Sequence, residues 1–439
     1  MATPAPRLQA FRASVLHFVD DPALAGAAAV VVHEDGLLVL TDGRVSALGD
    51  ASALLPGLPP AAELTDYRGR LLMPGFIDCH AHYPQTDVIA SAGEQLLSWL
   101  ERYVFPCEAR FADATVAQET AGFFCDELLR NGTTSAQCFA TVHPQAVEAL
   151  FGAAEARGMR MTTGLVLMDR NAPPALCVDA ELAHAQGEAL IARWHGRGRA
   201  RYAVTPRFAA TSPPRQLALA GRQFAAHPGV HLQSHLAENR GEVAWVAELF
   251  PGARSYLDVF DRFGLLGERA TYAHCIHIDD ADRRRLAATG SAIAFCPTSN
   301  LFLGSGLFDI DAARTQGVRV GLATDVGAGT SFSMLRTMSE AYKVGQLGGF
   351  ALSPWSAFYH ATLGAARALR IEDSVGSFAP GCEGDFVVLD PRSTPLLARR
   401  IACASDLEER LFALMTLGDD RAVEATWVMG ECRYRREAD

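Results

Sequence analysis

Short apolar runs recur through the middle of the 439-residue chain, and each is followed by a stretch with the pattern of a helix. The runs are Leu71–Ile77, Thr133–Phe139, Met161–Met168, Tyr202–Thr205, His231–His235, Ala270–His274, Ala292–Cys296 and Val318–Thr324. Strands that alternate with helices are typical of parallel βα units. This succession of units predicts an α/β fold in which a TIM-like (β/α)₈ barrel closes on itself.

The two ends of the chain have a different character. Residues 1–69 have the pattern of short strands and turns, with a hairpin predicted around Asp35-Gly36 and a second turn at Asp42-Gly43. Residues 376–439 contain a similar short apolar run, Asp385–Leu389, bounded by turn residues. We therefore expect both termini to form one small β-sandwich domain, residues 1–69 and 376–439, beside a barrel domain of residues 70–375.

Composition excludes several classes of partner. The net charge of −11 argues against nucleic acid. No apolar run is long enough to span a membrane, and Met1–Leu8 lacks a basic stretch followed by an apolar core, so we expect a cytoplasmic protein. The ten cysteines are scattered without a CxxC pair, which predicts mostly buried free thiols.

Metal-binding side chains stand at the ends of the predicted strands. His80 and His82 follow the first strand, and residues two apart on an extended segment point the same way. His235, His274 and Asp325 end the fifth, sixth and eighth strands. The carboxyl ends of barrel strands build the active site of such folds. Imidazoles and a carboxylate on one rim therefore predict a metal centre, and these donors suit Zn²⁺ or Fe²⁺.

Two further residues refine this prediction. Glu238 lies three residues after His235, where it could shuttle protons beside a metal-activated water. The alternative is a solvated glutamate that begins the next helix, where acidic residues are favoured. Lys343 is the only lysine and lies beyond Asp325, so no lysine on a middle strand is available to bridge two metals. We therefore predict one metal ion per chain.

Several segments match a known family. Pro74–His82, which reads PGFIDCHAH, resembles the metal signature of the amidohydrolase superfamily, and so does the order of the histidines and Asp325. Further segments, which together span nearly the whole chain, resemble the purine deaminases of that superfamily. They are HYPQ at 82–85, WLERYVFP at 99–106, TPRF at 205–208, CPTSNL at 296–301, TDVGAG at 324–329 and MTLGDD at 415–420.

This resemblance implies hydrolytic deamination of guanine to xanthine and ammonia by a Zn²⁺-activated water, in a homodimer. The implied metal ligands are His80, His82, His235 and Asp325. The implied catalytic residues are Glu238, His274 and Asp325. The implied contacts to guanine are His82, Tyr83, Pro84, Gln85, Trp99, Arg207, Phe208, His235 and Glu238. Among these, Gln85 and Arg207 would recognise the polar edge of the base, while Phe208 and Trp99 would cover its face.

Two alternatives stay open at this point. A related barrel hydrolase could act on another ring, such as adenine, cytosine, a thio-adenosine or a hydantoin, with the same metal site. A non-catalytic purine-binding or metal-storing barrel would keep the fold without the chemistry. Other zinc and nucleotide chemistries fit poorly, because the sequence has no HExxH, no HxE with PCxxC, no GxxxxGK[ST] and no GxGxxG.

Overall fold

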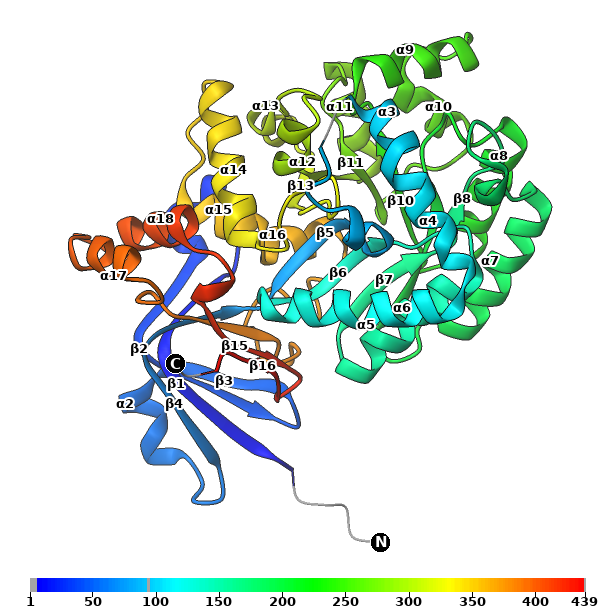
Figure 1. The fold of residues 1–439 in the computed structure, drawn as a ribbon. Helices are drawn as coiled ribbons and strands as arrows, with labels where there is room; N and C mark the ends of the chain where they lie inside the picture. The colour runs from blue at the N-terminus through cyan, green and yellow to red at the C-terminus, as the bar shows by residue number, and fades with distance from the viewer. Residues whose placement is uncertain (1–5, 93–94, 438–439) are drawn as a thin grey trace, which may run out of the picture.

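The terminal and central strands form two separate sheets in the computed structural model, which describes residues 6–92 and 95–437 (Figure 1). The predicted barrel with a small β unit from both termini is confirmed. The residue boundaries of the two domains stay predictions. Residues 1–5 and 438–439 of the predicted terminal domain, and residues 93–94 of the predicted barrel, lie outside the described residues.

The terminal sheet joins strands from both ends of the chain in the order β16-β15-β14-β4-β1-β2-β3. Its strands are β1 (Leu8–Phe18), β2 (Val30–Thr41), β3 (Arg44–Asp50), β4 (Glu63–Pro74), β14 (Phe386–Leu389), β15 (Val423–Val428) and β16 (Glu431–Arg435). The β1–β4 pair is parallel and the other pairs are antiparallel. Phe11 of β1 packs against Phe386 and Trp427, with ring centroids 4.8 Å apart in each case. The two termini therefore share one apolar core.

The predicted hairpin at Asp35-Gly36 is wrong. Strand β2 runs unbroken from Val30 to Thr41, and Gly36 pairs with Ala13 beside an irregularity in β1. A Cβ at Gly36 would lie 2.9 Å from Val15 Cγ2, so the glycine admits a close neighbouring strand instead of forming a turn. The turn predicted at Asp42-Gly43 is confirmed, because it joins β2 to β3.

The barrel strands follow the order β5-β6-β7-β9-β10-β11-β12-β13, with the short β8 paired to β9. They are β5 (Phe76–His82), β6 (Thr133–Phe139), β7 (Arg160–Gly164), β8 (Val166–Leu167), β9 (Ala200–Pro206), β10 (His231–Leu236), β11 (Ala270–His274), β12 (Ala292–Phe295) and β13 (Arg319–Leu322). Two backbone hydrogen bonds connect the segment after β13 to β5: Asp325 N donates to His80 O (2.9 Å), and His82 N donates to Val326 O (2.6 Å).

The predicted first barrel strand, Leu71–Ile77, is divided in the structure. Residues 71–74 end β4 of the terminal sheet, and β5 of the barrel begins at Phe76. Residues on both sides of the junction are buried, and buried strands are apolar. The apolar pattern of the sequence therefore continues across Gly75 and does not mark where one strand ends and the next begins. A Cβ at Gly75 would lie 2.3 Å from Thr134 Oγ1, which explains a glycine at the crossing. His80 and His82 consequently lie within the first barrel strand instead of after it.

Helices surround the barrel and cover one side of the terminal sheet (Figure 1). Those between the barrel strands are α3 (Leu96–Trp99), α4 (Phe105–Ala109), α5 (Ala114–Arg130), α6 (Pro144–Arg157), α7 (Ala180–Trp194), α8 (Pro214–Ala226), α9 (Arg240–Leu249), α10 (Tyr256–Arg262), α11 (Asp280–Thr289), α12 (Pro297–Phe302) and α13 (Ile310–Thr315). The others are α1 (Pro22–Ala25), α2 (Ala51–Leu54), α14 (Met334–Leu347), α15 (Pro354–His360), α16 (Leu363–Ala368), α17 (Pro395–Ala402) and α18 (Leu407–Leu417).

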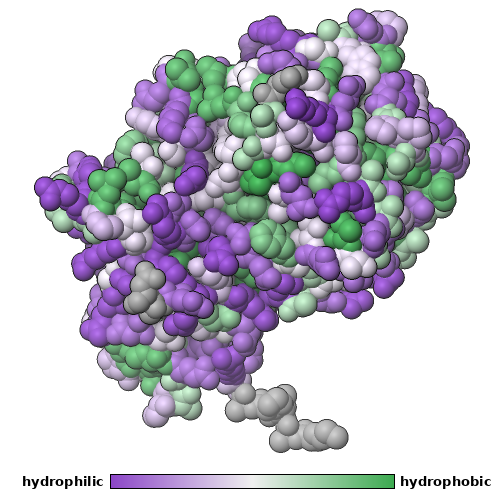
Figure 2. Space-filling model, in the orientation of Figure 1, coloured by the Kyte–Doolittle hydropathy of each residue, from purple (hydrophilic) through white to green (hydrophobic). Residues whose placement is uncertain are grey.

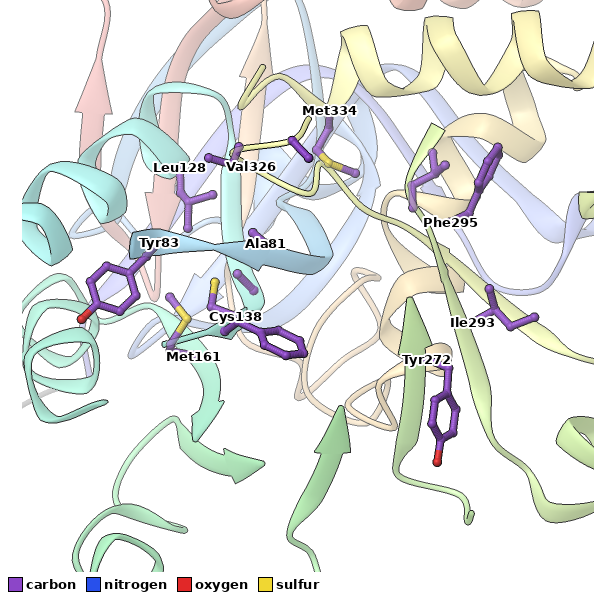
Figure 3. Packing of buried hydrophobic residues seen from close by; sticks show 14 of the residues in the cluster. Ala81, Tyr83, Leu128, Cys138, Met161, Tyr272, Ile293, Phe295, Val326 and Met334 are labelled. Atoms are coloured by element: carbon purple, nitrogen blue, oxygen red, sulfur yellow. The ribbon is translucent and has the colours of Figure 1, made fainter. Parts of the chain in front are cut away.

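The main core lies between the barrel strands and these helices. Figure 3 shows apolar side chains of this cluster on several barrel strands, among them Ala81 of β5, Cys138 of β6 and Ile293 of β12. On the face drawn in Figure 2, hydrophilic residues predominate over the terminal sheet, and hydrophobic residues are scattered in small groups over the barrel. All ten cysteines are free, as predicted, and most are buried. Within the described residues, no helix combines the length and apolar character that a membrane crossing requires.

Candidate metal and substrate site

Strand β5 carries the first donors of the site because its side chains alternate between two faces. Asp78, His80 and His82 share the face towards the barrel interior, and all three are at most 2% exposed. Cys79, on the opposite face, approaches the Ala365 carbonyl of α16. Asp78 accepts hydrogen bonds from Thr324 N (3.0 Å) and from the Thr324 hydroxyl, which ties β5 to the segment that carries Asp325.

Four predicted metal ligands converge at the carboxyl end of the barrel. His82 Nε2 lies 3.1 Å from His80 Nε2 and 3.0 Å from His235 Nε2. Asp325 Oδ1 lies 3.2 Å from His80 Nε2 and 3.5 Å from His82 Nε2. The four side chains come from β5, β10 and the segment after β13, so residues far apart in the chain meet in one cluster.

The chemistry of this donor set fits a divalent cation. Burial lowers the pKa of His80, His82 and His235, which keeps each ring neutral with one lone pair. His235 Nδ1 lies 2.7 Å from the Arg207 carbonyl oxygen, so this nitrogen carries the proton and Nε2 turns its lone pair to the cluster. Nitrogen lone pairs and a carboxylate at these separations repel one another unless a proton or a cation lies between them, and one cation can satisfy all four at once. The set therefore has the ligand types and number of a zinc-type site.

His274 lies beside the donor cluster, held by a residue that the sequence analysis did not single out. Asn300 Oδ1 lies 2.9 Å from His274 Nδ1, and His274 Nε2 lies 3.4 Å from Glu238 Oε2 and 3.8 Å from Asp325 Oδ2. Burial alone would lower the pKa of His274, but these two carboxylates outweigh it and raise that pKa. The backbone of His274 has φ of 71° at the end of β11, an uncommon conformation for a non-glycine residue.

Glu238 is buried and faces His274, so the alternative of a solvated glutamate that begins α9 is wrong. Burial raises the pKa of Glu238 to about 7, and Ser305 Oγ donates to its Oε1 at 3.2 Å. The backbone N–H of Glu238 donates to Glu242 Oε2 (2.9 Å), and Tyr256 donates its hydroxyl proton to Glu242 Oε1 (2.8 Å). This anchored carboxyl can take up and release a proton near neutral pH.

A cavity opens beside the cluster. It is lined by His82, Gln85, Leu96, Trp99, Leu100, Arg207, Phe208, His235, Glu238, Glu242, His274, Leu303, Asp325 and Ala328. Most residues predicted to contact guanine are in this lining. Tyr83 and Pro84 are not: the Tyr83 hydroxyl donates to the Ala146 carbonyl of α6 at 2.7 Å. A role for these two residues in binding stays a prediction.

Sequence reasoning missed Glu108, a fully buried residue behind the cavity wall. Its Oε1 accepts from Gln85 Nε2 (3.1 Å) and its Oε2 accepts from Arg207 Nη1 (2.7 Å). The residue lies just after the WLERYVFP segment, but a single sequence gives no sign of partners 23 and 99 positions away. Asn300 lies within the CPTSNL segment of the family resemblance, whereas no motif marks Glu242 or Ser305.

Two other groups bear on the number and type of ions. The Cys296 thiol lies close to His80, His274 and Asp325, but it approaches the Ala294 carbonyl at 3.4 Å, as a thiol donor does. Lys343 pairs with Glu340 on α14 (2.7 Å), with 56% of its side chain exposed, so it is no bridging ligand in the barrel. Neither group points to a second metal ion, and one ion per chain stays a prediction.

The fold and the cluster together define a class of protein: a (β/α)₈ barrel with histidine and aspartate metal donors at the carboxyl ends of its strands, beside a largely buried cavity. The model of the amidohydrolase family matches residues 71–432. The chain belongs to this family.

Individual relatives extend the comparison. The chain is 49% identical to guanine deaminase of Escherichia coli (strain K12) over 410 residues, which are 93% of each chain. The solved structure of E. coli guanine deaminase has a TM-score of 0.96 and 48% identity, covering 98% of this chain and all of that one. Guanine deaminase from C. acetobutylicum, with guanine bound in its active site, has a TM-score of 0.88 and 28% identity, covering 97% of this chain and all of that one.

Proposed function

We propose that this chain catalyses the hydrolytic deamination of guanine to xanthine and ammonia, with Zn²⁺ held by His80, His82, His235 and Asp325. One observation carries the proposal: a single cavity is lined by three of the four metal donors, by Glu238 and His274, and by the polar side chains of Gln85 and Arg207. The similarity to E. coli guanine deaminase across most of the chain supports the same activity and favours guanine over the other rings considered.

The proposed chemistry divides between the ion and the protein. A bound Zn²⁺ lowers the pKa of a water molecule and so supplies a nucleophile near neutral pH. One of two carboxylates, Glu238 or Asp325, takes the first proton from the attacking water. Glu238 delivers one proton to the ring and then the second, released from the hydroxyl of the tetrahedral centre, to the leaving amine, which its pKa near 7 allows. Asn300 accepts from Nδ1–H of His274, and the raised pKa of this ring lets its protonated form also donate from Nε2, to the attacking water or to the oxygen of the developing tetrahedral centre. Asp325 takes part in the same proton transfers.

The remaining lining residues bind the base. Arg207 presents a rigid planar set of donors that suits a carbonyl oxygen, and Phe105 packs against its guanidinium, 5.6 Å from the ring centroid. Phe208 and Trp99 offer aromatic surface to the flat purine. Each buried polar contact that a wrong base fails to make weakens its binding, which gives such a site its selectivity.

The activity test uses purified protein whose metal content has been measured. Incubation with guanine is expected to yield xanthine and ammonia in equal amounts. A panel of adenine, cytosine, a thio-adenosine and a hydantoin is expected to react far more slowly. Faster turnover of a panel member would replace the proposed substrate, and no turnover of any of them by the zinc-loaded protein would favour a non-catalytic binding protein.

Arg207→Ala is expected to raise the KM for guanine by about 10- to 100-fold, the effect of losing one buried polar contact. The backbone carbonyl that holds His235 remains, so metal content is expected to stay unchanged. Steady-state kinetics and elemental analysis measure the two quantities. Arg157→Ala is a matched control, because Arg157 pairs with Asp126 on the outer helices. An unchanged KM and base preference in Arg207→Ala would contradict the assignment.

The finer points of the proposal follow from sequence resemblance. Fe²⁺ suits the same donors, so elemental analysis of protein purified without added metal distinguishes it from Zn²⁺. A homodimer is proposed on the same resemblance and is checked by light scattering during gel filtration. The cytoplasmic location stays a prediction.

A further inference from the structure

We infer that Glu108 is a positioning residue that sets the hydrogen-bonding polarity of the purine pocket, so that the pocket accepts a 6-oxo purine and rejects a 6-amino purine. The inference rests on the proposed function, because that function makes a purine the ligand. Glu108 is absent from the cavity lining and acts only through Gln85 and Arg207, which are part of that lining.

The first step concerns the side-chain amide of Gln85. A carboxylate paired with an arginine only accepts hydrogen bonds, so the Gln85 group 3.1 Å from Glu108 Oε1 must be the NH₂ group. The Gln85 carbonyl oxygen is thereby turned the other way, towards Gly327 N at 3.4 Å. A carbonyl oxygen has two lone pairs, so an acceptor position remains for a ligand.

Gly327 makes this arrangement compact. A Cβ at position 327 would lie 2.4 Å from the Gln85 backbone carbonyl oxygen, so the glycine lets the two segments approach closely. Gln85 is 2% exposed and confined between Gly327 and Glu108. The flipped orientation would place the Gln85 carbonyl oxygen against the Glu108 carboxylate and its NH₂ group against Gly327 N–H, which pairs acceptor with acceptor and donor with donor.

The second step concerns Arg207. One of its Nη1 hydrogens is donated to Glu108 Oε2 at 2.7 Å, within a pair in which both side chains are at most 2% exposed. The carboxylate balances the buried guanidinium charge and leaves other N–H donors of Arg207 for a ligand. The pocket wall therefore presents donors from Arg207 and an acceptor from Gln85.

This polarity matches one class of purine. A 6-oxo purine carries a carbonyl acceptor next to a ring N–H donor, which complements a wall with donors and an acceptor. A 6-amino purine carries a donor next to an unprotonated ring nitrogen, which reverses both positions. Buried groups that are left unpaired lower affinity by about 10-fold or more.

Glu108→Gln is the informative variant because it keeps the side-chain volume and changes only the hydrogen-bonding pattern. The new amide has one oxygen, which pairs with Arg207, and one NH₂ group, which faces Gln85. Gln85 would then turn its carbonyl oxygen to that NH₂ group and its own NH₂ group to the pocket. The acceptor for the ring N–H would be lost.

The test measures equilibrium binding of hypoxanthine and adenine by calorimetry to the metal-loaded protein, with chromatography to confirm that adenine is unchanged. Wild type is expected to bind hypoxanthine at least about 10-fold more tightly than adenine, and Glu108→Gln is expected to lose most of that preference. Its KM for guanine should rise more than its kcat falls. Glu383→Gln, which neutralises another buried carboxylate paired with Arg160, should keep the wild-type preference.

Glu108→Asp provides a second variant if Glu108→Gln fails to fold. Its carboxylate still only accepts, so the preference for hypoxanthine should survive even where both affinities fall. An unchanged preference in Glu108→Gln, a lost preference in Glu108→Asp, or adenine turnover by wild type would overturn the inference. Guanine turnover by wild type tests the proposed function separately, because hypoxanthine binding requires no reaction.

Discussion

Glu238→Gln is expected to keep its metal ion and to lose deaminase activity by about 10²- to 10⁴-fold, the contribution of a well-placed general acid–base. Glutamine has nearly the same shape but cannot exchange a proton. Its amide can still meet Ser305 and His274, so the pocket and the donor cluster should keep their geometry. The loss should therefore fall mainly on kcat.

The measurement is the steady-state rate of xanthine formation, with elemental analysis of the same preparation. Glu248→Gln is a suitable control, because Glu248 is an exposed glutamate on the same helix, α9. It should behave as wild type. Activity of Glu238→Gln near the wild-type value would reject Glu238 as the proton-transfer residue, and loss of the ion would show that the variant acts through metal binding.

His235→Ala is expected to abolish detectable turnover and to lower the metal content from one equivalent per chain towards zero. His235 supplies one nitrogen of the cluster and lies 3.0 Å from His82 Nε2, so its removal leaves three donors and an open side facing the cavity. Prolonged treatment of wild type with a chelator should give the same inactive state, because the ion is what activates the water. Added Zn²⁺ should restore only the wild type.

Elemental analysis and an activity assay before and after chelation check this expectation. His227→Ala is the control, since His227 lies at the end of α8 and pairs with Glu188 on the outside of the barrel. Full activity in a metal-free preparation would remove the ion from the proposed mechanism. Two equivalents of metal per wild-type chain would contradict the single-ion prediction.

The barrel and the donor set could be predicted because their signals are local. Each strand is a short apolar run, and each donor stands at or near the end of one. The boundary between β4 and β5 could not be placed, because residues on both sides of Gly75 are apolar and buried. At Asp35-Gly36 a turn-forming pair lies inside a strand, where packing against Val15 outweighs its local preference.

The residues that hold the site's side chains in place by hydrogen bonds were harder to predict than those side chains themselves. Glu108 and Asn300 accept hydrogen bonds from residues 99 and 26 positions away in the chain, and a single sequence does not indicate which distant residues meet in the fold. Local backbone geometry was equally hidden: His274 and Asp325 both have positive φ, which turns their side chains at the strand ends in a way that strand alternation does not predict.

The hydrogen bonds that close the barrel between β5 and the segment after β13 determine when, during folding, the metal donors come together. Asp78 and Thr324, which join across this closure, are 246 positions apart, and His80 and Asp325 are their neighbours in the chain. The first and last donors therefore meet only after the ring of strands is complete. A chain that lacks its last barrel strand, or in which β5 and β13 have separated, still carries His80 and His82 together on β5. It does not bring all four metal donors into one cluster. Metal binding by the complete donor set therefore requires that the whole barrel has folded and closed.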